Sequence, residues 1–226
     1  MAGVCYLRDV ASGASRRVIG FTPPRELIFR RALGATLEGC RSVLDVGCGT
    51  RSPLGAVGFS GFAVGLDLSW PTLMAARAAR HHTALVRADA ADVDRVFRPA
   101  SVDAVVALDV IEHLEREPAV ALIGALERVA RRRVVIFTPN GYVPQPATPE
   151  NPHQEHRSGF GAADMRALGY RVRGINGLGC LCGPFAESRW APGALWRRIS
   201  DLTAPLVYRV PRLAFALLCV KDLTRR

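Results

Sequence analysis

Hydrophobic and polar positions follow two alternating patterns after residue 40. Short runs of valine, leucine, isoleucine and alanine occupy residues 42–46, 62–67, 84–88, 102–108 and 134–138. Such continuous apolar runs are typical of strands buried on both faces. Segments with helical spacing of apolar residues separate them, near 52–57, at 71–80 and at 118–131. Strands that alternate with helices predict an α/β fold with a doubly wound, mostly parallel sheet and helices on both faces.

The segments outside this core have weaker patterns. Residues 21–39 begin with prolines and end in glycine, and their apolar spacing predicts a helix before the first strand. The proline-rich connection 139–161 is long enough to suggest a functional loop. A helix near 162–168 and a strand at 170–175 follow. The apolar run at 213–220 predicts a last, antiparallel strand over 212–220, with a surface helix on a membrane as its alternative.

We interpret residues 1–226 as a single domain, because the length and the 49% hydrophobic residues suffice for one large core. Within it, residues 1–40 form a helical lid or packing segment and 41–138 a ligand-binding core. Residues 139–226 supply an acceptor-side loop, a flap and the last strands. An amphipathic flap at 190–210 would select a bulky or lipid-linked acceptor, whereas mere packing at the sheet edge would allow any small metabolite.

Charge and cysteine content change this picture little. The net charge is +10, but Lys221 is the only lysine among 30 basic residues, and the arginines are dispersed. This composition indicates a GC-rich genome, and we expect no nucleic-acid partner, although weak attraction to anionic substrates or membranes stays open. Six cysteines without a CxxC pair, and no secretory pattern or membrane-spanning run, predict a reduced cytoplasmic protein. A redox or metal pair at Cys180 and Cys182 is a minor alternative.

Acidic residues stand at the ends of four predicted strands. Asp45 precedes a turn built on Gly47 and Gly49, and glycine allows positive φ and close approach of a ligand. Asp67, Asp89 and Asp109 follow the next strands, with Glu112 and His113 after the last of them. Each acid alone could be a helix cap or turn residue. Together they predict a ligand site at the carboxyl edge of the sheet.

The motifs "VLDVGCGT", "VGLDLS", "RADAAD" and "LDVIEHL" resemble, in order and spacing, those of the class I (Rossmann-like) S-adenosylmethionine-dependent methyltransferases. The resemblance covers roughly residues 25–175, and it implies S-adenosylmethionine as the cofactor. A nicotinamide-dependent oxidoreductase is disfavoured, because Ser52 replaces the third glycine of the dinucleotide motif. The chain also lacks a Tyr-x-x-x-Lys pair.

The resemblance implies a role for each motif. Asp45 would orient the turn and reach the methionine amine, while Gly47, Cys48 and Gly49 would pass under the methionine and ribose. The remaining implied contacts lie at the ends of the next three strands: the ribose hydroxyls with Asp67, the adenine with Leu68, Asp89 and Ala90, and the sulfonium with Leu108 and Asp109.

Histidines are the candidate catalytic bases. Glu112-His113 matches a position where some quinone and phenol O-methyltransferases carry Glu-His, sometimes with a divalent metal, although these residues could also cap a helix. We assign no metal. His156, on the long loop, is the preferred base, and His153 and Asn140 are candidate acceptor-binding residues. The alternatives are a loop histidine bonded to the backbone and an Asn-Gly turn. His81 and His82 are expected at the surface.

These expectations predict methyl transfer to an oxygen, or less favourably a nitrogen, of a small-molecule, natural-product or sugar acceptor. The C-terminal half is loosely similar to bacterial methyltransferases of glycan and natural-product pathways. The alternatives are RNA methylation and a cofactor-binding partner protein without catalysis. RNA methylation would favour an Asn-Pro-Pro-Tyr-like run where this chain has "DVIEHL". The acceptor, the methylated atom, a metal requirement and the oligomeric state stay open.

Overall fold

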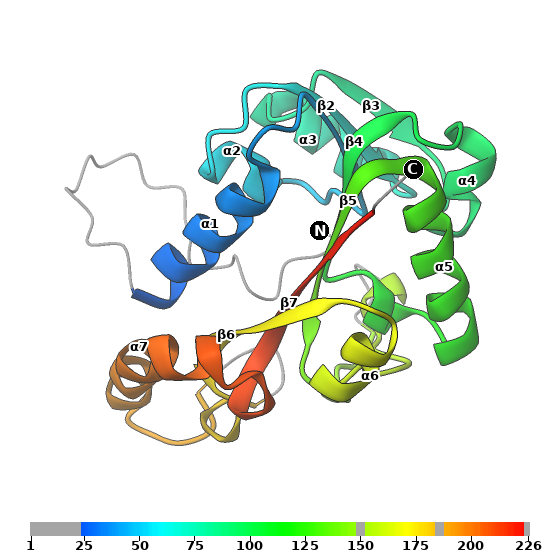
Figure 1. Cartoon of the computed structure of the whole chain (residues 1–226). Coiled ribbons are helices and arrows are strands. Elements are labelled where there is room, and N and C mark those ends of the chain that lie inside the picture. Colours follow the sequence, from blue (N-terminus) through cyan, green and yellow to red (C-terminus); the bar gives the residue numbers. More distant parts are fainter. Residues whose placement is uncertain (1–23, 148–151, 184–187, 224–226) are drawn as a thin grey trace.

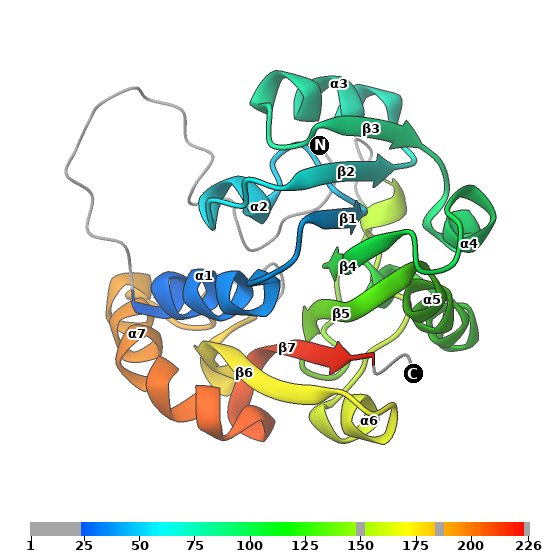
Figure 2. The same ribbon diagram turned by 45° about the horizontal axis from the view of Figure 1, so that its top comes forward.

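A single seven-stranded sheet organises the protein (Figure 1). The computed structural model describes residues 24–147, 152–183 and 188–223. The strand order is β3-β2-β1-β4-β5-β7-β6. Helices lie on both faces of the sheet (Figure 2), which confirms the doubly wound α/β fold.

Six of the seven strands run in one direction, and β7 alone runs against them. The strands that pair in parallel are β1 (Ser42–Val46), β2 (Phe62–Asp67), β3 (Ala84–Arg87), β4 (Val102–Leu108) and β5 (Ala130–Pro139). β7 (Ala214–Asp222) lies between β5 and β6 (Arg171–Leu178) and is antiparallel to both. The strand order reverses between β1 and β4, so a ligand cleft is expected at their carboxyl ends.

Helices connect these strands. They are α1 (Pro24–Leu37), α2 (Pro53–Ala56), α3 (Trp70–Ala79), α4 (Val93–Val96), α5 (Arg116–Val129), α6 (Ala162–Ala167) and α7 (Gly193–Arg209). Short 3₁₀ turns occupy η2 (Ala90–Asp92), η3 (Ile111–His113), η4 (Pro152–Gln154), η5 (Gly179–Leu181) and η7 (Pro211–Leu213). The helix expected before the first strand is therefore present as α1.

Two hydrophobic layers sandwich the sheet. On one face α1 buries Phe29, Leu33 and Leu37, which recur every four residues and therefore share one side of the helix. On the other face α5 and α6 contribute Leu126 and Met165, among others. Each fully buried side chain of this size contributes about 1.5 to 3 kcal/mol relative to exposure. This packing fixes the strand ends on which the site is built.

The C-terminal region settles one open alternative. Residues 214–222 form β7, which pairs with strands on both sides, so the antiparallel strand is confirmed and the surface helix at 213–220 is wrong. The segment 193–209 is a helix, α7, that the sequence did not indicate, and Pro205 lies within it. Within the described residues, no helix is both long and apolar enough to cross a membrane.

Candidate functional site

The turn after β1 brings backbone to the cleft. Gly47 and Gly49 have φ of +66° and +60°, in the left-handed region that favours glycine. A Cβ on Gly47 would lie 2.7 Å from a methyl of Val110, which belongs to the β4 end. Between the glycines, the buried Cys48 donates its N–H to the carbonyl of Leu66 at 3.0 Å. The turn is therefore packed against both neighbouring strands and leaves no room for a side chain at Gly47.

Asp67 fixes this turn from the end of β2. Its Oδ2 accepts the N–H of Gly49 at 3.1 Å, and its Oδ1 accepts the N–H of Ser69 at 2.9 Å. Burial raises the pKa of the Asp67 carboxyl, while these two hydrogen bonds and the nearby charge of His153 lower it in part. The acid expected to bind ribose and the histidine expected near the acceptor therefore lie at the same edge.

His82 forms a buried pair with Asp45 that the sequence did not predict. The Nε2 of His82 lies 2.9 Å from Oδ2 of Asp45, and the two side chains are only 1% and 2% exposed. The expectation that His82 is a surface residue is wrong, because the chain after α3 turns back under the β1 end. An apolar neighbourhood would have been the signal, but His82 stands in the polar-looking "RHHT".

The expected adenine side is more open. Leu68 exposes 42% of its surface, which leaves its side chain free to pack against a ligand. Asp89 is exposed and precedes Ala90 in η2, where its Oδ1 accepts the N–H of Ala91 at 2.9 Å. Asp89 is thus a helix cap, and its carboxylate keeps further lone pairs for a ligand.

Two acidic side chains meet after β4. Leu108 is half-buried at the strand end, and Asp109 has φ of +55°, with its N–H bonded to the carbonyl of Phe137 at 2.9 Å. Burial and the adjacent Glu112 raise the pKa of Asp109 well above its ordinary value. Burial likewise raises the pKa of Glu112 to about 7, although the hydroxyl of Thr138 donates to its Oε2 at 3.1 Å. Such a carboxyl pair needs a proton or a cation between its charges.

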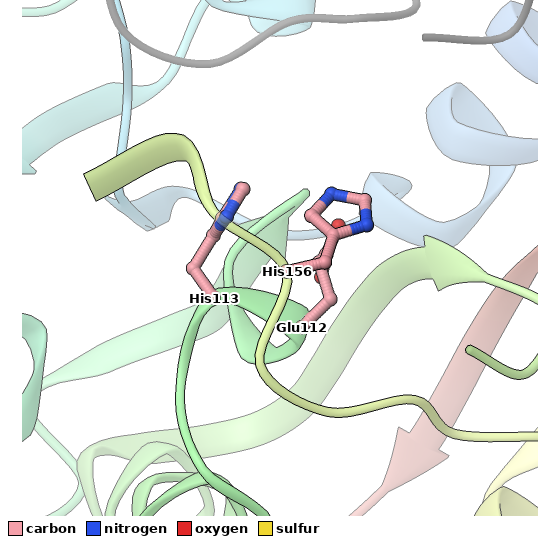
Figure 3. A group of neighbouring side chains, drawn as sticks. All are labelled: Glu112, His113 and His156. Carbon is pink, nitrogen blue, oxygen red and sulfur yellow. The ribbon is translucent and has the colours of Figure 1, made fainter. Parts of the chain in front are cut away.

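Glu112, His113 and His156 form a carboxylate–imidazole cluster (Figure 3). One potential ligand atom from each side chain lies within 4.8 Å of the others, and the two imidazole rings are 4.9 Å apart. Nδ1 of His113 donates to the carbonyl of Glu155 at 3.0 Å, and Nδ1 of His156 donates to that of Val143 at 2.7 Å. In the neutral ring, Nε2 then carries the lone pair.

Burial keeps both imidazoles neutral. It lowers the pKa of His113 and lowers that of His156 to about 4. Glu112 is 1% exposed as a residue, and its Oε1 atom makes no hydrogen bond within the described residues. The cluster therefore presents two lone pairs and a buried carboxylate oxygen, and these can accept protons or bind a divalent metal.

Backbone hydrogen bonds carry His156 to this position from the long loop. Its own N–H donates to Gln145, and the side chain of Gln145 donates to the carbonyl of Gln154, both at 2.9 Å. The next two N–H groups, at residues 157 and 158, donate to the carbonyl of Glu112 at 2.8 and 3.1 Å. These bonds hold the loop against η3. The sequence could not predict this placement, because the bonds use backbone groups that almost every residue carries.

A cavity of about 440 Å³ lies beside the cluster. Tyr142 and Val143 line it, and both are hydrogen-bonded to His156. The Tyr142 hydroxyl donates to the backbone carbonyl of His156 at 3.3 Å, and the carbonyl of Val143 accepts from Nδ1 of His156. Arg189 and Arg212 also line the cavity. Tyr142 and Val143 thus connect this charged cavity of small-molecule size to His156, which does not itself line it.

Asn140 lines the same cavity, but its amide nitrogen is used within the protein. It donates to the carbonyls of Pro211 and Ala214 at 3.0 and 2.9 Å, while the Asn140 backbone N–H donates to Phe215 at 2.9 Å. Asn140 thus joins the end of β5 to the start of β7. Any contact with an acceptor has to use its carbonyl oxygen.

Comparison with known proteins agrees with this geometry. Residues 44–138, which span β1 to the end of β5, match the family described as methyltransferase domain. A methyltransferase domain therefore spans β1 to the end of β5. The match contains the glycine turn and the acids after β2, β3 and β4, so the methyltransferase resemblance of the sequence is confirmed. This domain agrees with S-adenosylmethionine, the cofactor that the sequence motifs imply.

Solved methyltransferases share the fold. A SAM-dependent methyltransferase from Archaeoglobus fulgidus is 20% identical, with a TM-score of 0.56, over 88% of this chain and 94% of that one. The magnesium protoporphyrin IX methyltransferase of Synechocystis PCC 6803 with bound SAM is 16% identical, with a TM-score of 0.53, over 97% and 90%. The small RNA methyltransferase HEN1 is 17% identical, with a TM-score of 0.56, over 95% of this chain and 27% of that one. No curated protein sequence matches this methyltransferase.

Proposed function

We propose that this methyltransferase transfers the methyl group of S-adenosylmethionine to a hydroxyl oxygen of a small molecule that carries an anionic group. The observation that carries the proposal is the carboxylate–imidazole cluster beside the arginine-lined cavity. Natural-product and sugar acceptors fall within this class. The cofactor supplies an electrophilic methyl on its sulfonium, and everything else rests on how the chain positions the acceptor.

The glycine turn and Asp67 are the proposed cofactor side of the site. Val110 fills the space that a Cβ on Gly47 would need, so only glycine allows the turn to follow this path beside the cleft. The two oxygens of Asp67 are oriented by the N–H groups of Gly49 and Ser69, and each keeps a lone pair for a ribose hydroxyl. Asp45, held by His82, supports the turn from beneath.

The cluster suits a hydroxyl acceptor. An amine attacks a sulfonium without help, whereas a weakly acidic hydroxyl gains from a base that removes its proton. His156 is neutral at neutral pH because burial lowers its pKa to about 4, and its Nδ1 is fixed on Val143. Its Nε2 is therefore the proposed acceptor of the hydroxyl proton, with His113 beside it.

The cluster also fits a divalent cation. One carboxylate and two imidazoles match Zn²⁺, Fe²⁺ or Mn²⁺, and each imidazole already donates its other nitrogen to a carbonyl, as metal-bound histidines do. A cation would also balance the buried pair of Asp109 and Glu112. Bound there, it would supply Lewis-acid activation of an oxygen.

The cavity supports the acceptor class. About 440 Å³ is within the range of small-molecule sites. Arg189 and Arg212 are two lining cations, and a guanidinium binds carboxylate or phosphate groups well. An acceptor with such a group would be held by the arginines, and its hydroxyl would have to reach His156 past Tyr142 and Val143.

Methyl transfer should be measured with radiolabelled S-adenosylmethionine and a panel of phenols and sugars that carry carboxylate or phosphate groups. Matched amines and a small RNA serve as competing acceptors. We expect label in the hydroxyl acceptors and at least a hundredfold lower turnover for His156→Gln, in line with the loss of a general base. Glu155→Gln, an exposed neighbour on the same loop, is the matched control. Label in RNA or in amines alone would contradict the proposal.

Cofactor and metal binding are tested separately by calorimetry. Asp67→Ala should weaken S-adenosylhomocysteine binding by about 1 to 3 kcal/mol through lost hydrogen bonds to a charged group, while Asp164→Asn should not. Mn²⁺ and Zn²⁺ titrations of the wild type, Glu112→Gln and Glu155→Gln then examine the cluster. Metal binding that survives Glu112→Gln, or none in the wild type, would leave His156 as a base without metal.

A further inference from the structure

Helix α7 presents an apolar and basic face to solvent. Leu195, Leu202 and Leu206 are 49%, 81% and 54% exposed, and they recur at spacings of seven and four residues. In a helix these spacings place them on one side. The opposite side packs on the protein through small or branched residues: Ser200, Ala204 and Val207. Figures 1 and 2 show α7 at the outside of the molecule, beyond the edge strand β6.

Arginines flank this leucine stripe. Arg198 lies three residues after Leu195 and four before Leu202, and Arg209 lies three residues after Leu206, so both are on the exposed face of the leucines. Arg197 is exposed on another side of the helix. Among the described residues none of the three makes an ion pair. Asp201 is the only acidic residue of α7, and it pairs with Arg25 at 3.5 Å. The face therefore combines exposed leucines with uncompensated positive charge.

The apolar surface continues beyond both ends of the helix. Trp190, before α7, is 46% exposed and contacts Trp196 with its ring tilted by 56° and the ring centroids 5.2 Å apart. Leu213, after α7, is 43% exposed. Tryptophan and leucine beside arginine are the side chains that interfacial helices place at the level of lipid headgroups.

We propose that this surface, defined by Leu195, Arg198, Leu202, Leu206 and Arg209, docks on a bilayer that contains anionic lipids. The charge pattern selects this occupant. A second copy of the chain would bring like charges together, because the net charge is +10 and the stripe is flanked by arginines. Anionic headgroups pair with the arginines while the acyl region receives the leucines. Docking is independent of methyl transfer.

Vesicle co-sedimentation of the full-length protein tests the proposal without cofactor or acceptor. Vesicles of phosphatidylcholine with phosphatidylglycerol should bind the protein at least tenfold more tightly than phosphatidylcholine alone, and raised salt should weaken the binding. Leu202→Glu with Leu206→Glu should reduce binding to the anionic vesicles at least tenfold. Val120→Glu, at a 41% exposed position on α5, is the matched control and should leave binding unchanged.

The charge contribution needs its own pair of variants. Arg198→Gln with Arg209→Gln should weaken anionic binding about tenfold, whereas Arg77→Gln with Arg95→Gln, exposed on α3 and α4, should change it less than twofold. Equal binding by the Leu202 variant and the wild type would overturn the proposal, as would no sedimentation with anionic vesicles. A dimer in sedimentation velocity that Leu202→Glu dissociates, without any vesicle binding, would instead assign the surface to a second copy.

Discussion

Replacing His82 by alanine should destabilise the protein strongly, because the carboxylate of Asp45 would stay buried without its partner. The His82 and Asp45 side chains are 1% and 2% exposed, with 2.9 Å between Nε2 and Oδ2. Removing one member of a buried pair typically costs about 3 to 5 kcal/mol, against a total stability of about 5 to 15 kcal/mol. The loss is large enough to shift the unfolding midpoint well outside error.

Urea unfolding followed by tryptophan fluorescence measures this loss. The matched control is His81→Ala, the adjacent histidine, which makes no ion pair in the described part of the chain and should lose less than about 1.5 kcal/mol. The double variant with Asp45→Asn should lose clearly less than the sum of the two single losses, since the charge and its partner leave together. A His82→Ala variant within about 1 kcal/mol of the wild type, or equal losses for both histidines, would refute the reasoning.

Three further changes probe the turn, a helix start and a strand junction. Gly47→Ala should weaken S-adenosylhomocysteine binding at least tenfold in calorimetry, because its Cβ would lie 2.7 Å from Val110; unchanged affinity would contradict the placement of the turn. Asp164→Asn should cost about 1 kcal/mol at pH 7 in thermal unfolding. The backbone N–H at the start of α6, and then Arg116, hold the pKa of Asp164 below its ordinary 3.8, so this stabilisation is present above that value and disappears as the pH falls through the lowered pKa. A stability difference between the wild type and Asp164→Asn that does not change with pH would contradict this assignment. Asn140→Ala should lose about 1 to 3 kcal/mol in urea unfolding by leaving buried carbonyls unpaired, whereas no loss would show that water replaces the amide.

The fold was largely predictable because buried parallel strands leave a strong signal. Continuous apolar runs and the acids at their ends placed β1 to β5, and the sheet edge then followed from topology. The last strand was predictable for the same reason. Helix α7 was not, because it buries Ser200, Ala204 and Val207 on one face and exposes leucines on the other, the reverse of the usual pattern.

The site was predictable only in part. Asp67 and the glycine turn lie together as expected, since they follow neighbouring strands. His113 and His156 were separate candidates in the sequence, and their meeting depends on the backbone bonds of a long loop, which have no sequence signature. His82 was mistaken for a surface residue because a pair buried by long-range folding leaves no periodic pattern.

Lys221, the only lysine, gives the chain an internal reporter of opening. Its ammonium is bonded to both carboxylate oxygens of Glu127 and to the carbonyl of Leu168, each at 2.9 Å, within strand β7. A lysine-specific protease therefore has a single target bond in these 226 residues, and cleavage there reports the separation of this end of β7 from β5, with which Lys221 pairs. The cleavage rate at low protease concentration would measure the free energy of that opening directly, with no engineered label.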